Sequence, residues 1–199
     1  MSTTPKGSSR RRFLIAASGT VGGAGLLAAA WPFLASLRPS EKARAQGGPV
    51  QVDIGRLEAG QQITVVWRGR PVWVLKRTQE MLARMGTSAH RALLSDPDSA
   101  VTTQQPDYAR NATRSLHPEH LVVIGICTHL GCVPTFRPEV APEDLGRDWD
   151  GGYFCPCHGS RFDLAGRVYR GVPAPTNLVV PPYHYVKDDI VEIGVDPHG

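Results

Sequence analysis

The sequence has few cysteines, and it lacks a basic stripe, an internal repeat and a low-complexity tract. The formal net charge is only +4 in 199 residues. Much of that charge comes from Lys6 and Arg10–Arg12 at the N-terminus, so the remainder of the chain is close to neutral. Because no basic surface survives in the body, nucleic acid is excluded as the expected partner.

The length suits one ordinary domain with an appendage. The 17 prolines and 21 glycines indicate many turns and a β-rich body.

The N-terminus contains a charge-free run of 25 residues, Phe13–Leu37, rich in Ala, Gly and Leu. As a helix it would measure roughly 37 Å, which is enough to cross a hydrocarbon core of about 30 Å. The preceding Ser9-Arg10-Arg11-Arg12-Phe13-Leu14 resembles a twin-arginine export signal, and basic residues favour the cytoplasmic side. We therefore expect a cytoplasmic segment over 1–12 and a single-pass transmembrane anchor over 13–37, rather than a buried core helix.

Residues 38–49 are polar and contain several Pro and Gly, which predicts a flexible linker. It could let the following domain swing, or it could be a passive spacer. Ala43-Arg44-Ala45 has the small-x-small form of a cleavage site, but the apolar run is too long for a usual signal peptide. A retained anchor is therefore favoured over a cleaved signal.

From residue 50 onward, short apolar runs separated by turn signals predict an antiparallel β domain. A helix is expected over Thr78–Met85 with Thr78 as its N-cap, and surface loops are expected from about Ser88 to Pro118 and from Val133 to Tyr153. The expected strands are Val50–Ile54, Gln62–Trp67, Pro71–Leu75, Leu121–Cys127, Asn177–Pro181 and Ile190–Val195.

All four cysteines lie in two short segments, Cys127-Thr128-His129-Leu130-Gly131-Cys132 and Cys155-Pro156-Cys157-His158-Gly159-Ser160. The second segment is one residue too short for the haem-attachment string Cys-x-x-Cys-His. Two thiolates and two imidazoles suit either zinc or an iron–sulfur cluster. A closed zinc site would leave two cysteines without a role, whereas the split Cys-x-His and Cys-x-x-His pattern is that of a Rieske [2Fe–2S] centre.

The two hexapeptides, in this order, closely resemble those of the Rieske iron–sulfur subunits of cytochrome bc complexes. The export signal, anchor and linker extend the resemblance, which covers roughly half of the chain in motif terms. Gly171-Val172-Pro173-Ala174-Pro175 is similar to the family's Gly-Pro-Ala-Pro loop over the cluster, with Val172 in addition. The resemblance implies an all-β Rieske-type domain over 50–199, with a cluster-binding part at about 121–176 on a single N-terminal transmembrane helix.

The resemblance also implies a role for each residue of the two segments. Cys127 and Cys155 would bind the inner iron of one [2Fe–2S] cluster, and His129 and His158 the outer iron. Cys132 and Cys157 would form a disulfide. Ser160 would donate a hydrogen bond to a cluster sulfur and favour the reduced state.

Position 162 departs from the common family pattern, in which a tyrosine hydroxyl bonds a ligand sulfur. Phe162 lacks this hydroxyl, so we expect a lower midpoint potential than in tyrosine-bearing relatives. The other histidines have no ligand-like spacing to a cysteine and are expected to be surface or structural residues: His90, His117, His120, His184 and His198.

The implied function is electron transfer in a respiratory quinol–cytochrome c oxidoreductase of the bacterial inner membrane. His158, as the catalytic residue, would accept a hydrogen bond and a proton from ubiquinol on the periplasmic side. The implied partners are cytochrome b, a c-type cytochrome and the lipid bilayer, within a dimeric complex. The alternatives are an electron-transfer subunit of another exported oxidoreductase, such as an arsenite oxidase, and a zinc-bound binding module.

Overall fold

The computed structural model describes residues 7–38, 40 and 47–197. The chain divides into two compact units, Met1–Ala45 and Gln46–Gly199, and each is considered by itself. Most of the predicted linker and the whole of the Ala43–Ala45 cleavage motif lie outside the described residues, as does His198.

The first unit contains helix α1, Gly7–Ser36, with Pro32 inside it. The helix begins before the predicted anchor, so Arg10–Arg12 lie within its first turns. Within Ser9–Ser36 an 18-residue window has a mean hydropathy of 1.7 with no part buried, and among the described residues this is the one helix long and apolar enough to span a membrane. Its apolar side chains are exposed along the whole length, as expected for a helix that lies in lipid.

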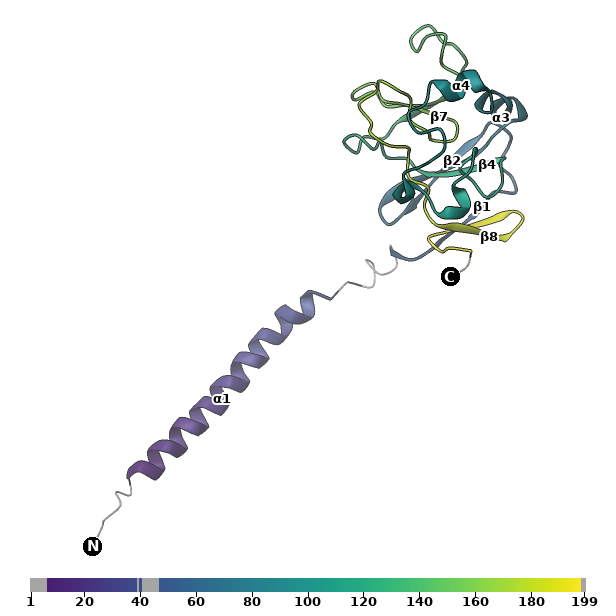
Figure 1. The fold of residues 1–199 in the computed structure, drawn as a ribbon. Coiled ribbons are helices and arrows are strands. Elements are labelled where there is room, and N and C mark those ends of the chain that lie inside the picture. The colour runs from purple at the N-terminus through teal and green to yellow at the C-terminus, as the bar shows by residue number, and fades with distance from the viewer. Residues whose placement is uncertain (1–6, 39, 41–46, 198–199) are drawn as a thin grey trace. The chain divides into compact units, whose positions relative to one another are not determined.

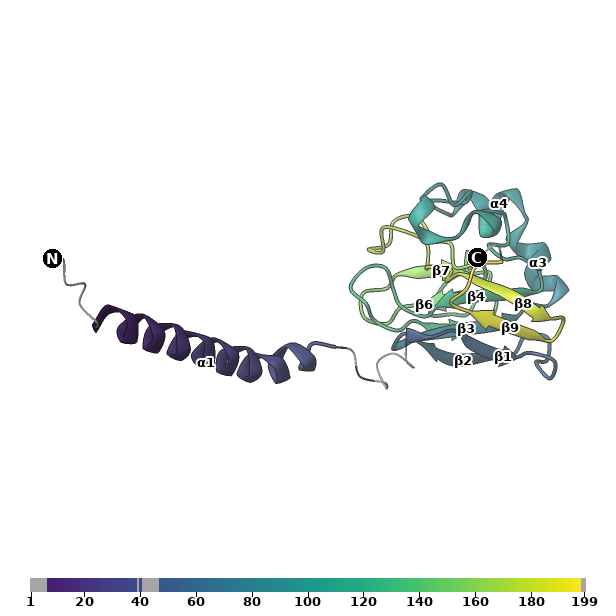
Figure 2. The ribbon, with the colours of Figure 1, turned by 90° about the horizontal axis from the view of Figure 1, so that it is seen from below.

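The second unit consists of three sheets of three strands, and every strand pairing is antiparallel. Figure 2 shows β2 and β3 on one side of the domain and α4 on the opposite side. The sheets have the strand orders β1-β9-β8, β2-β3-β4 and β5-β6-β7. Their bounds are β1 Val50–Asp53, β2 Gln62–Trp67, β3 Arg70–Lys76, β4 His120–Ile124, β5 Thr135–Arg137, β6 Gly152–Phe154, β7 Arg161–Asp163, β8 Tyr183–Lys187 and β9 Ile190–Ile193.

The β2-β3-β4 sheet forms the centre of the core. Residues 72–75 of β3 and 121–124 of β4 are buried without alternation, because both faces of these strands are covered. The Trp73 ring stacks on the Tyr153 ring of β6, with centroids 4.7 Å apart and an interplanar angle of 9°. This contact joins the central sheet to the β5-β6-β7 sheet, which carries the second cysteine segment between β6 and β7.

The helices α3, Gln79–Met85, and α4, Ser88–Ala92, follow β3 (Figure 1). The predicted N-cap is confirmed, because Thr78 accepts a hydrogen bond from the backbone N–H of Met81 at 3.2 Å. The expectation of surface loops from Ser88 onward is wrong. This stretch contains α4 and two 3-10 helices, and it buries several side chains, among them Leu94 and Arg114.

The strand expected over Asn177–Pro181 does not form. Its residues are extended, but their backbone bonds go to separate partners instead of one ladder: Leu178 N–H donates to the Gly166 carbonyl and Val180 N–H to the Gln104 carbonyl. Pro181 and Pro182 then have no N–H to donate. The segment Val133–Tyr153 is also more than a surface loop, because it contains β5 and buries Trp149 completely.

We predict that Gly152→Ala destabilises the domain by about 2–4 kcal/mol, because strain and overpacking add. Gly152 has a φ of +154°, and a Cβ there would overlap the carbonyl oxygen of Phe162 on the adjacent strand. The matched control is Gly69→Ala, at a φ of +72° with open space around it, which should cost only about 1 kcal/mol. Thermal unfolding of the detergent-solubilised protein measures both, and equal losses would contradict the close-approach argument.

Candidate metal centre

The two cysteine segments fold into turns with the same hydrogen-bonding pattern. In each of 127–132 and 155–160, the N–H of the first residue donates to the carbonyl of the sixth, at 2.8 Å in both. The N–H of the fifth residue donates back to the carbonyl of the first, at 3.0 and 2.9 Å respectively. That fifth residue is a glycine with positive φ, +84° at Gly131 and +78° at Gly159, a conformation that other residues rarely adopt.

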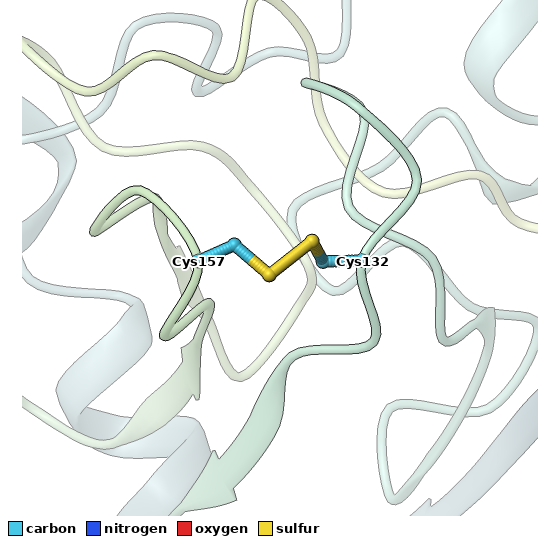
Figure 3. The surroundings of a disulfide bond; sticks show 2 residues. All are labelled: Cys132 and Cys157. Carbon is cyan, nitrogen blue, oxygen red and sulfur yellow. A yellow bond between two sulfur atoms is a disulfide. The ribbon is translucent and has the colours of Figure 1, made fainter.

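The disulfide Cys132–Cys157 joins these two turns across a sequence separation of 25 residues. It is the pairing that the family resemblance implies, and Figure 3 shows it running directly from one loop to the other. Closing a loop of this length stabilises the fold by about 3 kcal/mol in the chain-entropy model. The bond therefore holds the two turns in register.

The Cys155 sulfur lies within 4.8 Å of both disulfide sulfurs. This sulfur trio is not itself a metal site, because two of its members are oxidised in the disulfide and cannot act as thiolates. The free thiols are those of Cys127 and Cys155, which are 2% and 1% exposed. Burial raises the pKa of the Cys155 thiol, and the neighbouring Cys127 raises it further.

The four predicted ligand residues are brought together. The rings of His129 and His158 meet edge to face, with centroids 4.8 Å apart. His129 is half-buried and His158 exposed, whereas the two thiols are buried. Two inner sulfurs and two outer imidazoles fit the donor set of a Rieske cluster, in which two histidines replace two cysteines on one iron.

Hydrogen bonds tie the proline-containing loop 171–175, together with the adjoining Thr176, to both turns. The Ser160 Oγ accepts from the backbone N–H of Ala174 at 3.1 Å, and the Thr128 Oγ1 donates to the Thr176 carbonyl at 2.7 Å. Sequence reasoning assigned no role to Thr128. Its only signal was a hydroxyl residue inside the first segment, and its partner could not be identified without the structure.

Ser160 is completely buried, and among the described residues its hydroxyl proton has no acceptor. A buried hydroxyl whose oxygen is engaged but whose proton is free is suited to donate to a cluster sulfur. Phe162, on β7 opposite Tyr153, is also completely buried and offers no donor.

We predict that Phe162→Tyr raises the midpoint potential. A hydroxyl that bonds a ligand sulfur is worth about 1 kcal/mol, on the order of 50 mV for one electron. The matched control is Tyr153→Phe, since the Tyr153 hydroxyl bonds Gln62 at 2.9 Å and not a ligand residue. Voltammetry should show a rise only in Phe162→Tyr, and an unchanged midpoint in that variant would contradict the assigned role of position 162.

Comparison with known proteins matches two family models to this chain. Residues 96–184 match "Rieske [2Fe-2S] domain". Residues 1–40 match "Ubiquitinol-cytochrome C reductase Fe-S subunit TAT signal". The two matches cover the metal centre and the N-terminal helix.

Two relatives are named "Ubiquinol-cytochrome c reductase iron-sulfur subunit". The protein from Allochromatium vinosum is 58% identical over 94% of this chain and 89% of its own length. The protein from Bradyrhizobium diazoefficiens is 43% identical over 93% of this chain and 94% of its own. A chain of the solved "Hyperthermophilic respiratory Complex III" aligns with 90% of this chain and 98% of its own length, with a TM-score of 0.49 and 24% identity.

The alignments with the two relatives extend over nearly the whole length of both chains and therefore span the metal centre. The chain therefore belongs to the family of ubiquinol-cytochrome c reductase iron-sulfur subunits and contains a Rieske [2Fe–2S] domain.

Proposed function

We propose that this chain is the electron-transfer subunit of a membrane-bound quinol–cytochrome c oxidoreductase. It takes one electron, together with a proton, from ubiquinol and passes the electron to a c-type cytochrome. The observation that carries the proposal is the pair of perpendicular imidazoles, one exposed and one half-buried, on the turns that contain the two buried thiols. Relatives named for this reductase at up to 58% identity support it, and none of the relatives reported above is named for arsenite oxidation.

A [2Fe–2S] cluster bound at this site supplies one-electron chemistry at a potential raised by its histidine ligands. Cys127 and Cys155 would bind one iron of such a cluster, and His129 and His158 would bind the other. His158 is the exposed member of the set, so its ring can accept a hydrogen bond from a quinol hydroxyl. The same ring then holds the proton that leaves the quinol.

Exposed apolar side chains lie beside the histidines in sequence and suit docking to a hydrophobic quinol site. Leu130 and Val133 are 70% and 55% exposed. We assign them to the contact with cytochrome b, where they exclude water from the hydrogen bond between His158 and quinol. The helix α1 anchors the subunit in the inner membrane, with the Rieske domain on the periplasmic side and Arg10–Arg12 toward the cytoplasm.

We predict that a quinol-site inhibitor changes the EPR signal of the reduced cluster in membranes, because the inhibitor contacts His158 in place of quinol. Leu130→Arg should abolish this change, since it places a charge in the apolar contact. The matched control is Val66→Arg, because Val66 on β2 is similarly exposed at 66% and lies outside both turns. An inhibitor that binds without altering the wild-type signal would contradict direct contact.

We further predict that the midpoint potential falls as the pH rises above neutrality, because reduction is coupled to proton uptake on the histidine ligands. The slope should approach about 59 mV per pH unit for one proton and one electron. Redox titration across the pH range measures it. A midpoint that stays constant up to about pH 10 would remove the proton coupling from the proposal.

A further inference from the structure

One five-residue turn collects every charged or imidazole side chain that the structure describes as buried. The turn is Asp163–Arg167, which begins at the last residue of β7. Five such side chains are at most 2% exposed, and each either belongs to this turn or donates to it: Arg77, His90, Arg114, Asp163 and Arg167.

Two members of this group neutralise each other. The Arg167 guanidinium donates to the Asp163 carboxylate, with Nε at 2.8 Å and Nη2 at 2.7 Å. His90 lies between two carboxylates, with Nε2 3.2 Å from Asp163 and Nδ1 2.8 Å from the partly exposed Asp150. A protonated His90 is therefore balanced by Asp150.

Arg77 has no carboxylate partner among the residues that the structure describes. Its Nη1 donates to the carbonyl of Leu164 at 3.1 Å. Its other acceptors are also neutral oxygens, from Thr113, Ser115 and Pro118.

Arg114 likewise has no carboxylate partner among the described residues, and it also donates to the Asp163–Arg167 turn. Its Nη1 donates to the carbonyls of Ala165 and Gly166 at 3.2 and 3.3 Å. Its Nη2 donates to the Gln104 carbonyl and to the Gln105 side chain. Within the described part of the chain its Nε has no acceptor.

Both guanidinium charges are therefore buried without a salt-bridge partner of their own. Asp163 attracts both of them over a longer distance, but its carboxylate is already paired with Arg167. Burial lowers the pKa of each to about 10, so both remain protonated at neutral pH. Burying an unpaired charge is costly, and apolar residues often serve as well or better where only stability is needed. The surplus charge is thus better explained by a function than by stability alone.

The charges lie close behind the second ligand turn. Only Arg161 and Phe162 separate Ser160 from the Asp163–Arg167 turn, so the two turns lie about 10 Å apart along the extended chain. Arg77 directly follows β3, and Trp73 of β3 stacks on Tyr153, which lies on the strand that enters the same ligand turn. Both strands of the hairpin that carries Cys155 and His158 are therefore connected to this positive region.

We propose that Arg77 and Arg114 set the midpoint potential of the metal centre by stabilising its reduced form electrostatically. The inference rests on the proposed redox function. One-electron reduction adds one negative charge to the centre, and a fixed positive charge attracts it. At the separation of the two turns, about 10 Å along the extended chain, and an effective dielectric constant of 20, one such charge favours reduction on the order of tenfold. This contribution offsets the hydrogen bond that Phe162 cannot make.

The test is redox titration of the full-length protein in detergent, followed by EPR. The wild-type signal first establishes that the cluster is present, so failure of the proposed function is separable from failure of this inference. In Arg114→Gln and in Arg77→Gln, the equilibrium constant for reduction should fall about tenfold, equivalent to about 59 mV for one electron. In Arg114→Lys and Arg77→Lys, which keep the charge, it should change by less than about threefold.

Two controls distinguish an effect of the buried charge on the midpoint from an effect of altered structure. Arg170→Gln removes an exposed guanidinium that also donates to a carbonyl, that of Leu94, and water should screen its effect. Ser115→Asp leaves Arg77 in place and sets a carboxylate against its Nη2, which bonds the Ser115 hydroxyl at 2.7 Å. It should lower the equilibrium constant as Arg77→Gln does, and it provides a readout if the glutamine variants do not fold.

The shift caused by a buried charge should also persist at 1 M salt, where exposed charges are screened within about 3 Å. Equal midpoints in the glutamine, lysine and wild-type proteins would overturn the proposal. So would an unchanged midpoint in folded Ser115→Asp, or a shift in Arg170→Gln as large as that in Arg114→Gln.

Discussion

The metal centre depends on holding two short turns face to face, although they come from separate parts of the chain. Each turn is closed by the same pair of backbone hydrogen bonds and contains a glycine with positive φ. The disulfide Cys132–Cys157 fixes one turn against the other. The hydroxyls of Thr128 and Ser160 then tie the proline-containing loop to each of them. With these links in place, two thiols are buried and two imidazoles face outward.

The part of the domain behind the second turn also helps to hold the two turns in place. The stack of Trp73 on Tyr153 joins the central sheet to the hairpin that carries the second turn. The buried charged residues meet at the turn that follows this hairpin, and they bind its carbonyl groups. In our proposal, the packing that positions Cys155 and His158 also sets the electric field around them. Stability and redox potential are linked through the same side chains.

The sequence predicts those parts of the fold and of the metal centre that depend on residues close together in the chain. The two hexapeptides, the N-cap at Thr78 and the strand Gln62–Trp67 depend on neighbouring residues, and they are found as expected. The short strands β5, β6 and β7 were not predicted, because three residues show no usable period. Asn177–Pro181 has the sequence pattern of a strand, but its backbone hydrogen bonds go to separate segments of the chain. Only the tertiary structure determines those partners.

The roles of His90 and of the buried arginines were equally invisible in the sequence. The partners of Arg77 and Arg114 are mostly backbone carbonyls, which carry no sequence signature, and those in the Asp163–Arg167 turn lie far away along the chain. His90 was correctly expected to be structural, but the two carboxylates around it could not be foreseen.

The central claim is that two cysteines and two histidines bind one cluster. Pulsed EPR of the reduced protein with ¹⁵N-labelled histidine tests it most directly. We predict couplings from two histidine nitrogens, together with loss of the cluster in His129→Ala and His158→Ala but not in His117→Ala. Coupling to fewer than two nitrogens, or a protein that contains zinc and gives no signal after reduction, would contradict it.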